Sequence, residues 1–211
     1  MSIIGDVVWW HNTLFSFVYQ ALRNPSVVGA LSPCSPYVAR EIVEHFANSK
    51  KLRILEVGAG TGTLSYYIVH ALKKDDLCDI IEIDESFCKI LRNKFGDKQQ
   101  ATITHASILD WKPTYKYDVI VCSLPFNVFS PDYVQKLLAH MQSLLKKDGI
   151  FSYIELMWLT SIKMQFVSQN KRQSMQKTLA IMKQFRSNNE SKTIPIYLNF
   201  TPLYVHHVTI R

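Results

Sequence analysis

Residues 54–69 read ILEVGAGTGTLSYYIV, and this stretch decides the fold of the chain. A short apolar run stops at three glycines, Gly58, Gly60 and Gly62, and residues with helical spacing follow them. Glycines at this point allow a sharp turn and a close approach of the backbone to a ligand. The free N–H groups at the start of the next helix favour a carboxylate or a phosphate. We therefore predict a strand, a ligand-binding turn and a helix.

Further strand patterns follow on the carboxyl side of this turn, separated by helical or polar patterns. The apolar runs that we expect to form these strands are CDIIEID (78–84), ATITHAS (101–107), YDVIVC (117–122) and IFSYIEL (150–156). Strands that alternate with helices form parallel crossovers, with helices on both faces of the sheet. The chain is therefore expected to have an α/β fold with a largely parallel sheet.

The last part of the chain predicts two helices and an antiparallel pair of strands. One helix is expected to have Ser130 as its cap and Pro131 at its first position. It is expected to end at Lys146, Lys147 and Gly149. A second helix is expected over 164–186, and the tail, 194–211, is expected to pair around a turn at Thr201-Pro202.

Two helices are also expected before the glycine turn. Residues 3–22 have an amphipathic pattern, and a second helix follows Ser35 as cap and Pro36 as first residue. We divide the chain into residues 1–48, a helical cover that can also serve as a membrane-interface segment, and residues 49–211, the ligand-binding domain. Both parts are expected to form one structural unit.

Composition excludes several functional classes. The four cysteines show no CxxC pairing and no histidine at metal-ligand spacing, which predicts a reduced intracellular protein without a metal site. The sequence shows no secretory signal and no apolar run that could cross a bilayer, so we expect a cytoplasmic location. The net charge of +7 lies mostly between Lys163 and Lys192, where Glu190 is the single acid.

An acidic residue ends the second predicted strand. Glu82 lies about 20 residues after the last glycine, where a carboxylate can accept hydrogen bonds from both hydroxyls of a ribose. Asp84 is the competing acid, but it directly precedes a helical pattern and is better explained as a helix cap. The ligand is therefore expected to be an adenosine derivative.

The spacing of Glu56 and the three glycines resembles the E/D-x-G-x-G-x-G pattern of the class I S-adenosylmethionine-dependent methyltransferases, over about Arg53 to Leu156. The resemblance implies a Rossmann-like fold and S-adenosyl-L-methionine as the cofactor. By it, Glu56 and the turn of Gly58, Ala59, Gly60 and Gly62 would hold the methionine portion. Glu82 would hold the ribose, with Ile83 beside it in the cofactor site.

The stretch HASILDW (105–111) is similar to the adenine-contacting turn of that family. Ser107 stands where an acid usually accepts from the adenine amine, and Ile108 stands where a side chain packs on the ring. The alternative is that Ile108 and Leu109 are ordinary core residues.

The stretch CSLPFN (122–127) is expected to present the methyl acceptor, because ligands lie beyond the carboxyl ends of parallel strands. The hydroxyl of Ser123 and the carbonyl of Leu124 can accept hydrogen bonds from an amine, Pro125 ends the strand, and Phe126 can form a flat wall. The pattern resembles that of methyltransferases acting on exocyclic or primary amines, so these four residues are the predicted catalytic set. The alternative is that Pro125 only ends the strand and Phe126 fills the core.

Two families share this loop. LRNPSVVGALSPCSPYVARE (22–41) resembles a segment of the bacterial phospholipid N-methyltransferases, and the tail NFTPLYVHH (199–207) resembles their ending. The ribosomal RNA adenine dimethyltransferases are the second family, but their Asn is replaced by Ser123. The resemblance favours an N-methyltransferase for a lipid amine such as phosphatidylethanolamine. The alternatives are an RNA adenine methyltransferase and a non-catalytic S-adenosylmethionine-binding protein.

A lipid substrate requires contact with a phospholipid membrane surface. The basic segment from Lys163 to Lys192 can contribute roughly 1 kcal/mol per Lys or Arg near anionic lipid. Trp9, Trp10 or Phe17 of the first helix can enter the headgroup layer. These features predict a peripheral protein on the inner face of the membrane. The same charge would also attract an RNA backbone, so charge alone does not choose the partner.

Overall fold

The computed structural model describes residues 34–46, 51–157, 167–199 and 201–211. The expected helix at 3–22, with Trp9, Trp10 and Phe17, lies outside the described residues, as does Lys163. The same holds for most of the segment 22–41 that resembles the phospholipid family.

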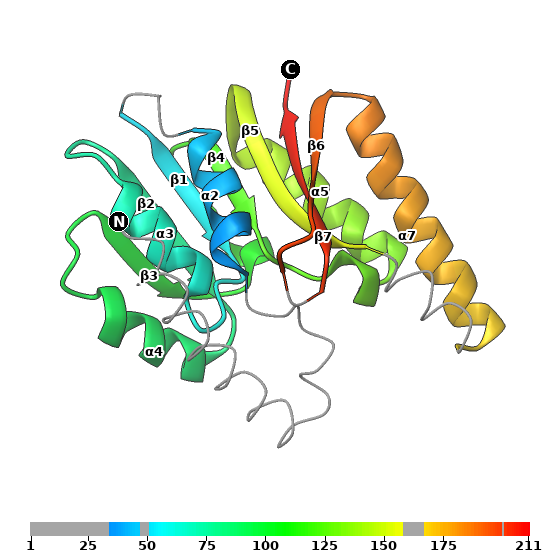
Figure 1. Ribbon diagram of the computed structural model, residues 1–211, viewed down its shortest axis with the longest axis horizontal. Coiled ribbons are helices and arrows are strands. Elements are labelled where there is room, and N and C mark those ends of the chain that lie inside the picture. The colour runs from blue at the N-terminus through cyan, green and yellow to red at the C-terminus, as the bar shows by residue number, and fades with distance from the viewer. Residues whose placement is uncertain (1–33, 47–50, 158–166, 200) are drawn as a thin grey trace.

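Seven strands form one sheet in the order β3-β2-β1-β4-β5-β7-β6 (Figure 1). The strands are β1 (Arg53–Val57), β2 (Leu77–Glu82), β3 (Ala101–His105), β4 (Tyr117–Cys122), β5 (Leu145–Leu156), β6 (Glu190–Ile196) and β7 (Leu203–Thr209). Strands β1 to β5 are parallel, and β7 runs antiparallel to both of its neighbours. The predicted fold class, with its antiparallel C-terminal pair, is confirmed. Pro195, which cannot donate to a ladder, lies on the edge strand β6.

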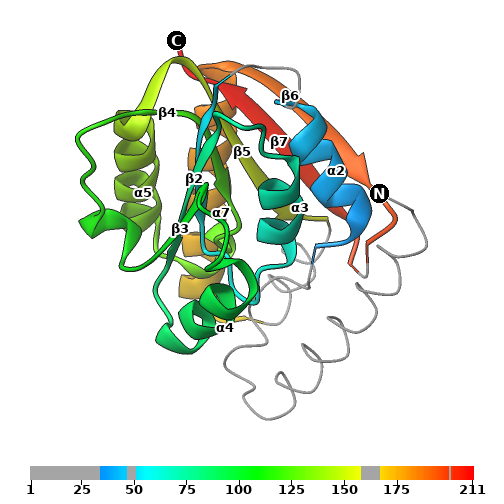
Figure 2. The ribbon, with the colours of Figure 1, turned by 90° about the vertical axis from the view of Figure 1, so that its left-hand side faces the viewer.

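Helices cover both faces of the sheet (Figure 2). The helices are α2 (Pro36–Glu44), α3 (Thr63–Ala71), α4 (Glu85–Phe95), α5 (Pro131–Leu144) and α7 (Gln169–Ser187), with short 3-10 turns η2 (Ile108–Asp110) and η3 (Phe126–Val128). Apolar residues of α2, α3 and α4 form one buried cluster, and those of α5 and α7 form another on the opposite face. The sheet separates the two halves of the core.

Helix starts largely follow the sequence prediction. Ser130 caps α5 by accepting from the Tyr133 N–H, and Asp84 caps α4 by accepting from the N–H groups of Ser86 and Phe87. Ser35 stands at the N-cap of α2, but its hydroxyl makes no cap hydrogen bond. Its backbone N–H instead donates to Asn199 Oδ1 at 2.8 Å, which ties the start of α2 to the β6–β7 connection.

The predicted end of the helix after Ser130 is wrong. Helix α5 ends at Leu144, and Lys146, Lys147 and Gly149 lie in β5. The reason is a contact that the sequence pattern does not reveal: the Lys146 ammonium lies 2.8 and 2.9 Å from the two carboxylate oxygens of Asp118 on β4. The buried Leu145, the first residue of β5, pairs with Tyr117 of β4. Pairing with β4 therefore takes over where the helix was expected to continue.

Candidate active site at the carboxyl edge of the sheet

The glycine turn between β1 and α3 has left-handed backbone at all three glycines, with φ of +74° at Gly58, +54° at Gly60 and +83° at Gly62. A Cβ atom on Gly58 would lie 2.8 Å from Leu124 Cδ2, and one on Gly62 would lie 2.8 Å from Leu91 Cδ2. Gly58 therefore lets the turn pack against the CSLPFN segment, and Gly62 lets α3 start against α4.

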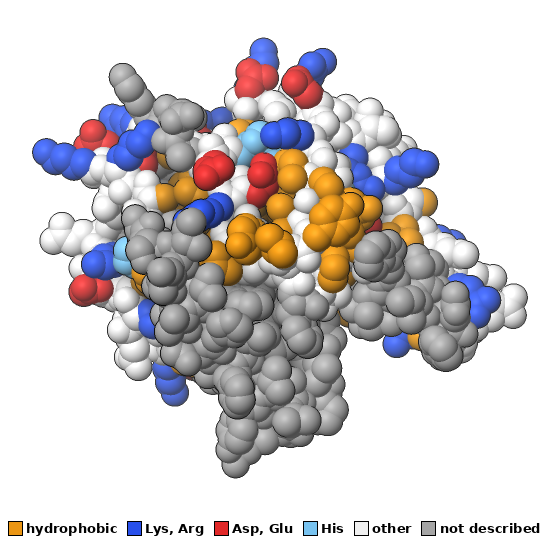
Figure 3. Space-filling view, viewed as in Figure 1, with side chains coloured by type: hydrophobic (Ala, Val, Ile, Leu, Met, Phe, Trp, Pro, Cys, Tyr) orange, Lys and Arg blue, Asp and Glu red, His pale blue; other side chains and the backbone are white. Residues whose placement is uncertain are grey.

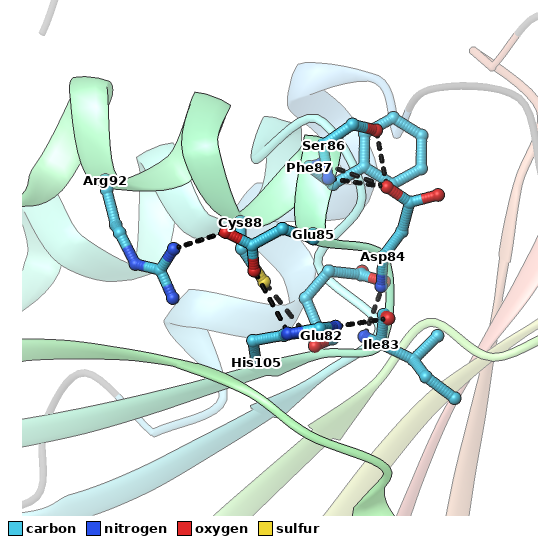
Figure 4. Close-up of polar contacts among 9 residues, drawn as sticks. All are labelled: Glu82, Ile83, Asp84, Glu85, Ser86, Phe87, Cys88, Arg92 and His105. Carbon is cyan, nitrogen blue, oxygen red and sulfur yellow. Dashed lines mark hydrogen bonds and ion pairs between the residues drawn. The ribbon is translucent and has the colours of Figure 1, made fainter.

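Glu82 ends β2, and its side chain bonds to the backbone of Ile83 and Asp84 (Figure 4) and to the glycine turn. Its Oε2 accepts from the Gly60 N–H at 2.8 Å, and its Oε1 accepts from the N–H groups of Ile83 and Asp84 at 2.8 and 3.0 Å. The side chain is buried. A carboxylate has about four acceptor positions, so one remains for a ligand hydroxyl. The ribose role of Glu82 stays a prediction.

Glu56 lies at the corresponding place on the neighbouring strand β1, but its surroundings are different. It is fully buried, and neither carboxylate oxygen has a hydrogen-bond partner among the described residues. Burial raises the pKa of this carboxyl to about 8, the charge of Glu82 adds to the rise, and nearby Ser65 opposes it. A buried carboxyl without a partner costs free energy. The α-amino group of a methionine-bearing cofactor would satisfy it, so this site fits S-adenosylmethionine.

The predicted adenine-side residues lie in two kinds of surroundings. Ile83 is 67% exposed, directly after Glu82, whereas Ile108 is buried in the core cluster of α5 and α7. The Ser107 hydroxyl accepts from the Leu109 N–H at 3.3 Å and so caps η2. An exposed apolar side chain at a strand end can cover the face of a ring. The position of Ile108 agrees with the core alternative.

The CSLPFN segment leaves the sheet as expected. β4 ends at Cys122, and the Ser123 N–H donates to the Val57 carbonyl at 3.0 Å. Pro125 then begins the short turn η3. Phe126 is buried, and its ring meets that of Tyr153 edge-on at a centroid distance of 5.7 Å. Phe126 is therefore a core residue, and it also lines a pocket.

That pocket was missed by sequence reasoning. It lies between η3, the end of β5 and α7, and it contains about 400 Å³ of space, including the part open to solvent. Its lining includes Phe126, Tyr153, Glu155, Leu156, Leu179 and Met182. One signal could have indicated it, since Glu155 is an acid in the otherwise apolar end of the run IFSYIEL.

Arg186, in the last turn of α7, turns its side chain inward. Its Nη1 donates to the Tyr153 hydroxyl at 2.5 Å and to Glu155 Oε2 at 3.0 Å. The other described basic residues of α7 are exposed: Lys171, Arg172, Lys177 and Lys183. The side chain of Arg186 points inward because a buried tyrosine and a half-buried carboxylate provide acceptors there.

The described residues contain no helix that is long and apolar enough to cross a membrane. They also contain no cluster of three or more His, Cys, Asp or Glu side chains suited to a metal ion. All four cysteines are buried free thiols. Burial raises the pKa of Cys34 and of Cys122 to about 12, so neither thiol has the ionised form that a nucleophile needs.

Comparisons with known proteins agree with this geometry. A family model described as a methyltransferase domain matches residues 54–149. The chain is 24% identical over 152 residues to an ornithine lipid N-methyltransferase of Singulisphaera acidiphila, covering 69% of this chain and 79% of that protein. It is 32% identical over 121 residues to a probable dimethyladenosine transferase of Caenorhabditis elegans, covering 56% of this chain and 34% of that protein.

A solved structure shares the fold over most of its length. The O-methyltransferase from Bacillus cereus in complex with SAH superposes with a TM-score of 0.69 at 12% identity, covering 93% of this chain and 91% of that one. At this identity the likeness concerns the fold. The fold of this chain therefore matches the known fold of that methyltransferase.

Proposed function

Since the chain is a class I S-adenosylmethionine-dependent methyltransferase, we propose that it methylates the amine of a phospholipid headgroup such as phosphatidylethanolamine. The observation that carries this proposal is the extent of the similarity to a lipid N-methyltransferase. That similarity covers 79% of the relative, whereas the similarity to the dimethyladenosine transferase covers 34% of that relative. The segment 22–41, which resembles the phospholipid family, supports the same choice.

The proposed cofactor site lies at the carboxyl ends of β1 and β2. In the proposal, Glu56 and the Gly58–Gly62 turn hold the methionine portion, and Glu82 holds the ribose with Ile83 at its side. Ser107 and Ile108 complete the adenine side. When bound, S-adenosylmethionine supplies an electrophilic methyl group on its sulfonium.

The proposed acceptor side lies at the carboxyl end of β4. Methyl transfer requires a neutral amine whose lone pair is aligned with the methyl group. In the proposal, the Ser123 hydroxyl and the Leu124 carbonyl accept the amine's N–H bonds, which orients the lone pair. Pro125 fixes the backbone of this loop, where η3 begins, and Phe126 limits the space beside the amine.

Contact with a membrane is part of the proposal, and the exposed side chains support it. β6 ends at the same edge as the carboxyl ends of β1 to β5, because Ile196 pairs with Leu203 and Leu203 pairs with Leu156. Tyr197 and Leu198, directly after β6, are 65% and 64% exposed. Apolar side chains gather over this part of the surface (Figure 3). An aromatic and an aliphatic side chain at this edge can enter the headgroup layer of an inner membrane face.

The division of the chain at residues 48 and 49 also remains a proposal. The described part of the cover, which includes Val38 and Ile42, packs in the same buried cluster as α3 and β1. This packing supports a cover that belongs to the same structural unit as the methyltransferase domain.

The experiment that tests the proposal compares acceptors directly. The full chain is incubated with radiolabelled S-adenosylmethionine and with vesicles of phosphatidylethanolamine, vesicles of an ornithine lipid, or ribosomal RNA. We expect label in lipid. Label in RNA alone would reject the lipid proposal in favour of the adenine methyltransferase, which the dimethyladenosine transferase similarity supports. Tight cofactor binding without label in any acceptor would favour the non-catalytic alternative.

A further inference from the structure

We propose that the pocket between η3, the end of β5 and α7 is the docking subsite for the protonated headgroup amine, where Glu155 Oε1 accepts a hydrogen bond from the ammonium group before that group loses its proton to solvent and the neutral amine meets Ser123 and Leu124. This inference rests on the proposed function and names the residue that recognises the substrate.

The pocket lies next to the strand end that presents the predicted catalytic loop. β5 is the neighbour of β4 in the sheet, and Cys122, the last residue of β4, pairs with Tyr153 of β5. Glu155 follows two residues after Tyr153, so both side chains point to the same face of the sheet. Phe126 of the loop lines the pocket together with them. The carboxylate is therefore within the reach of a group bound beside CSLPFN.

The carboxylate of Glu155 is held in one orientation from behind. Arg186 Nη1 lies 3.0 Å from Oε2, and His206 Nε2 lies 3.2 Å from the same oxygen. His206 is fixed in turn, because its Nδ1 lies 2.8 Å from the Thr193 hydroxyl. Among the described residues, none donates a hydrogen bond to Oε1. One oxygen of Glu155 is therefore positioned by the protein, and the other has no donor within the part of the chain that the structure describes.

Glu155 is ionised, so its Oε1 can accept a hydrogen bond from a cationic donor. Burial raises the pKa of Glu155, but His206 and the charge of Arg186 outweigh burial, so the pKa lies below its ordinary value. Burial also lowers the pKa of His206, and Arg186 lowers it further, which leaves the imidazole neutral at pH 7. An ionised carboxylate makes hydrogen bonds with a cationic donor that are about twice as strong as those between neutral groups.

The remaining walls suit an aliphatic headgroup better than a nucleobase. Leu156, Leu179 and Met182 provide apolar surface, and Phe126 and Tyr153 provide aromatic rings, which attract ammonium groups. The space of about 400 Å³ includes the part open to solvent, so we expect the amine end of a headgroup to enter the pocket from that open side. An adenine amine is a neutral donor and would gain less from the carboxylate. We therefore assign the subsite to a lipid amine.

The test uses a soluble headgroup and its neutral analogue. The full chain, saturated with S-adenosylhomocysteine, is titrated with ethanolamine phosphate and with ethylene glycol phosphate, in which a hydroxyl replaces the amine. Binding is followed by calorimetry or by backbone amide shifts. We expect the amine probe to bind at least 10-fold more tightly. Glu155→Gln should remove this preference and leave the affinity for S-adenosylhomocysteine unchanged. In phosphatidylethanolamine vesicles it should raise the lipid KM at least 10-fold.

Two further variants keep the test decisive. Leu179→Trp fills the pocket without touching the carboxylate network, so it should abolish binding of the amine probe even if Glu155→Gln fails to fold. Glu190→Gln is the matched control. It breaks the exposed ion pair with Arg211, whose N–O distance is 3.0 Å, at the end of β6 that is far from the pocket. It should change neither the preference for the amine probe nor the lipid KM. Equal affinity for both probes, or an unchanged preference in Glu155→Gln and Leu179→Trp, would overturn the subsite.

The outcomes also separate this inference from the proposed function. If the amine probe binds as expected but no lipid is labelled, the subsite stands and the lipid substrate fails. If an adenine-bearing RNA hairpin displaces the amine probe, the lipid assignment of the subsite is overturned. If lipid is labelled and the Glu155 and Leu179 variants keep their KM, the function stands and the subsite fails.

Discussion

The proposed cofactor site and the proposed acceptor subsite lie at the same edge of the sheet, but they are built differently. The methionine and ribose part of the cofactor site uses backbone and two carboxylates from one continuous segment, residues 53–84. The acceptor subsite combines side chains that are far apart in the chain, such as Phe126, Glu155 and Arg186. The first therefore depends on local backbone geometry and the second on tertiary packing. Variants in residues 53–84 should therefore act through local backbone and charge, whereas Glu155 and Leu179 variants should act through the packing of the subsite.

The largest effect is expected at Glu56 and depends on pH. Burial raises its pKa in the folded state to about 8 from an ordinary value of 4.5, so between these values the folded state keeps a proton that the unfolded state releases. The free energy of unfolding should therefore fall as pH rises through this window, by up to about 4 kcal/mol at roughly 1.36 kcal/mol per pKa unit. Urea unfolding of the wild type and Glu56→Gln at pH 5 and pH 9 measures this fall as the change in their difference, because the buried His207 and His206, whose pKa values are lowered, shift the stability of both proteins in the opposite direction.

Glu56→Gln provides the comparison for that effect, because glutamine imitates the neutral acid. The variant should match the wild type near pH 5 and exceed its stability near pH 9. A wild type and a variant with parallel pH profiles would show that Glu56 has an ordinary pKa.

Two substitutions in the glycine turn should separate the cost of left-handed backbone from the cost of steric overlap. Gly62→Ala combines a left-handed residue with a Cβ 2.8 Å from Leu91 Cδ2, so we expect a loss of about 3 kcal/mol in unfolding free energy. Gly60→Ala keeps the left-handed strain but meets no atom within 4 Å, so we expect a loss of about 1 kcal/mol. Chemical denaturation compares the two. Equal losses would contradict the packing that the turn makes against α4.

Glu82→Gln should weaken cofactor binding by about 1.5 to 3 kcal/mol, or roughly 10- to 100-fold, because bonds to a charged group are lost. The amide nitrogen would also face a backbone N–H that now donates to the carboxylate. Calorimetry with S-adenosylhomocysteine measures the change. Glu85→Gln, in the neighbouring exposed pair with Arg92, is the control. Equal affinity of Glu82→Gln and the wild type would remove Glu82 from the cofactor site.

The smallest effect is expected at Asp84, which caps α4. Asp84→Ala should lower the unfolding free energy by about 1 kcal/mol and leave cofactor affinity unchanged. Asp84→Asn should keep most of the stability, since an amide oxygen can still accept from Ser86 and Phe87. A large loss of cofactor affinity in Asp84→Ala would mean that the ribose acid had been assigned to the wrong residue.

The sequence predicts the cofactor side well because its signals are local. The strand, the glycines and the acid at the end of β2 follow one another within residues 53–82. The period of the apolar residues and the spacing of the glycines and the acid are therefore sufficient to place them. The cap at Asp84 is predicted for the same reason. The hydrogen bonds of Glu82 to Gly60 and to its own strand end were not predicted, because a spacing pattern does not show which groups a side chain meets.

The acceptor side was mostly hidden because distant contacts decide it. The partners of Arg186, Tyr153 and Glu155 of β5, lie about 30 residues earlier in the chain, so the sequence pattern of α7 does not reveal them. Helix α5 stops at Leu144 because the Lys146–Asp118 pair and the ladder to β4 replace the last helical turn. Propensity and periodicity do not contain this information, since tertiary partners override them.

The central claim is that one nucleoside cofactor lies in the glycine turn between Glu56 and Glu82, beside the pocket of Glu155. A crystal structure of the full chain with S-adenosylhomocysteine tests it most directly. We predict the amino nitrogen of the ligand within hydrogen-bond distance of Glu56, the ribose hydroxyls beside Glu82, and the sulfur facing CSLPFN. Ligand bound away from the glycine turn, or a Glu56 carboxyl still without a partner in the complex, would contradict the account.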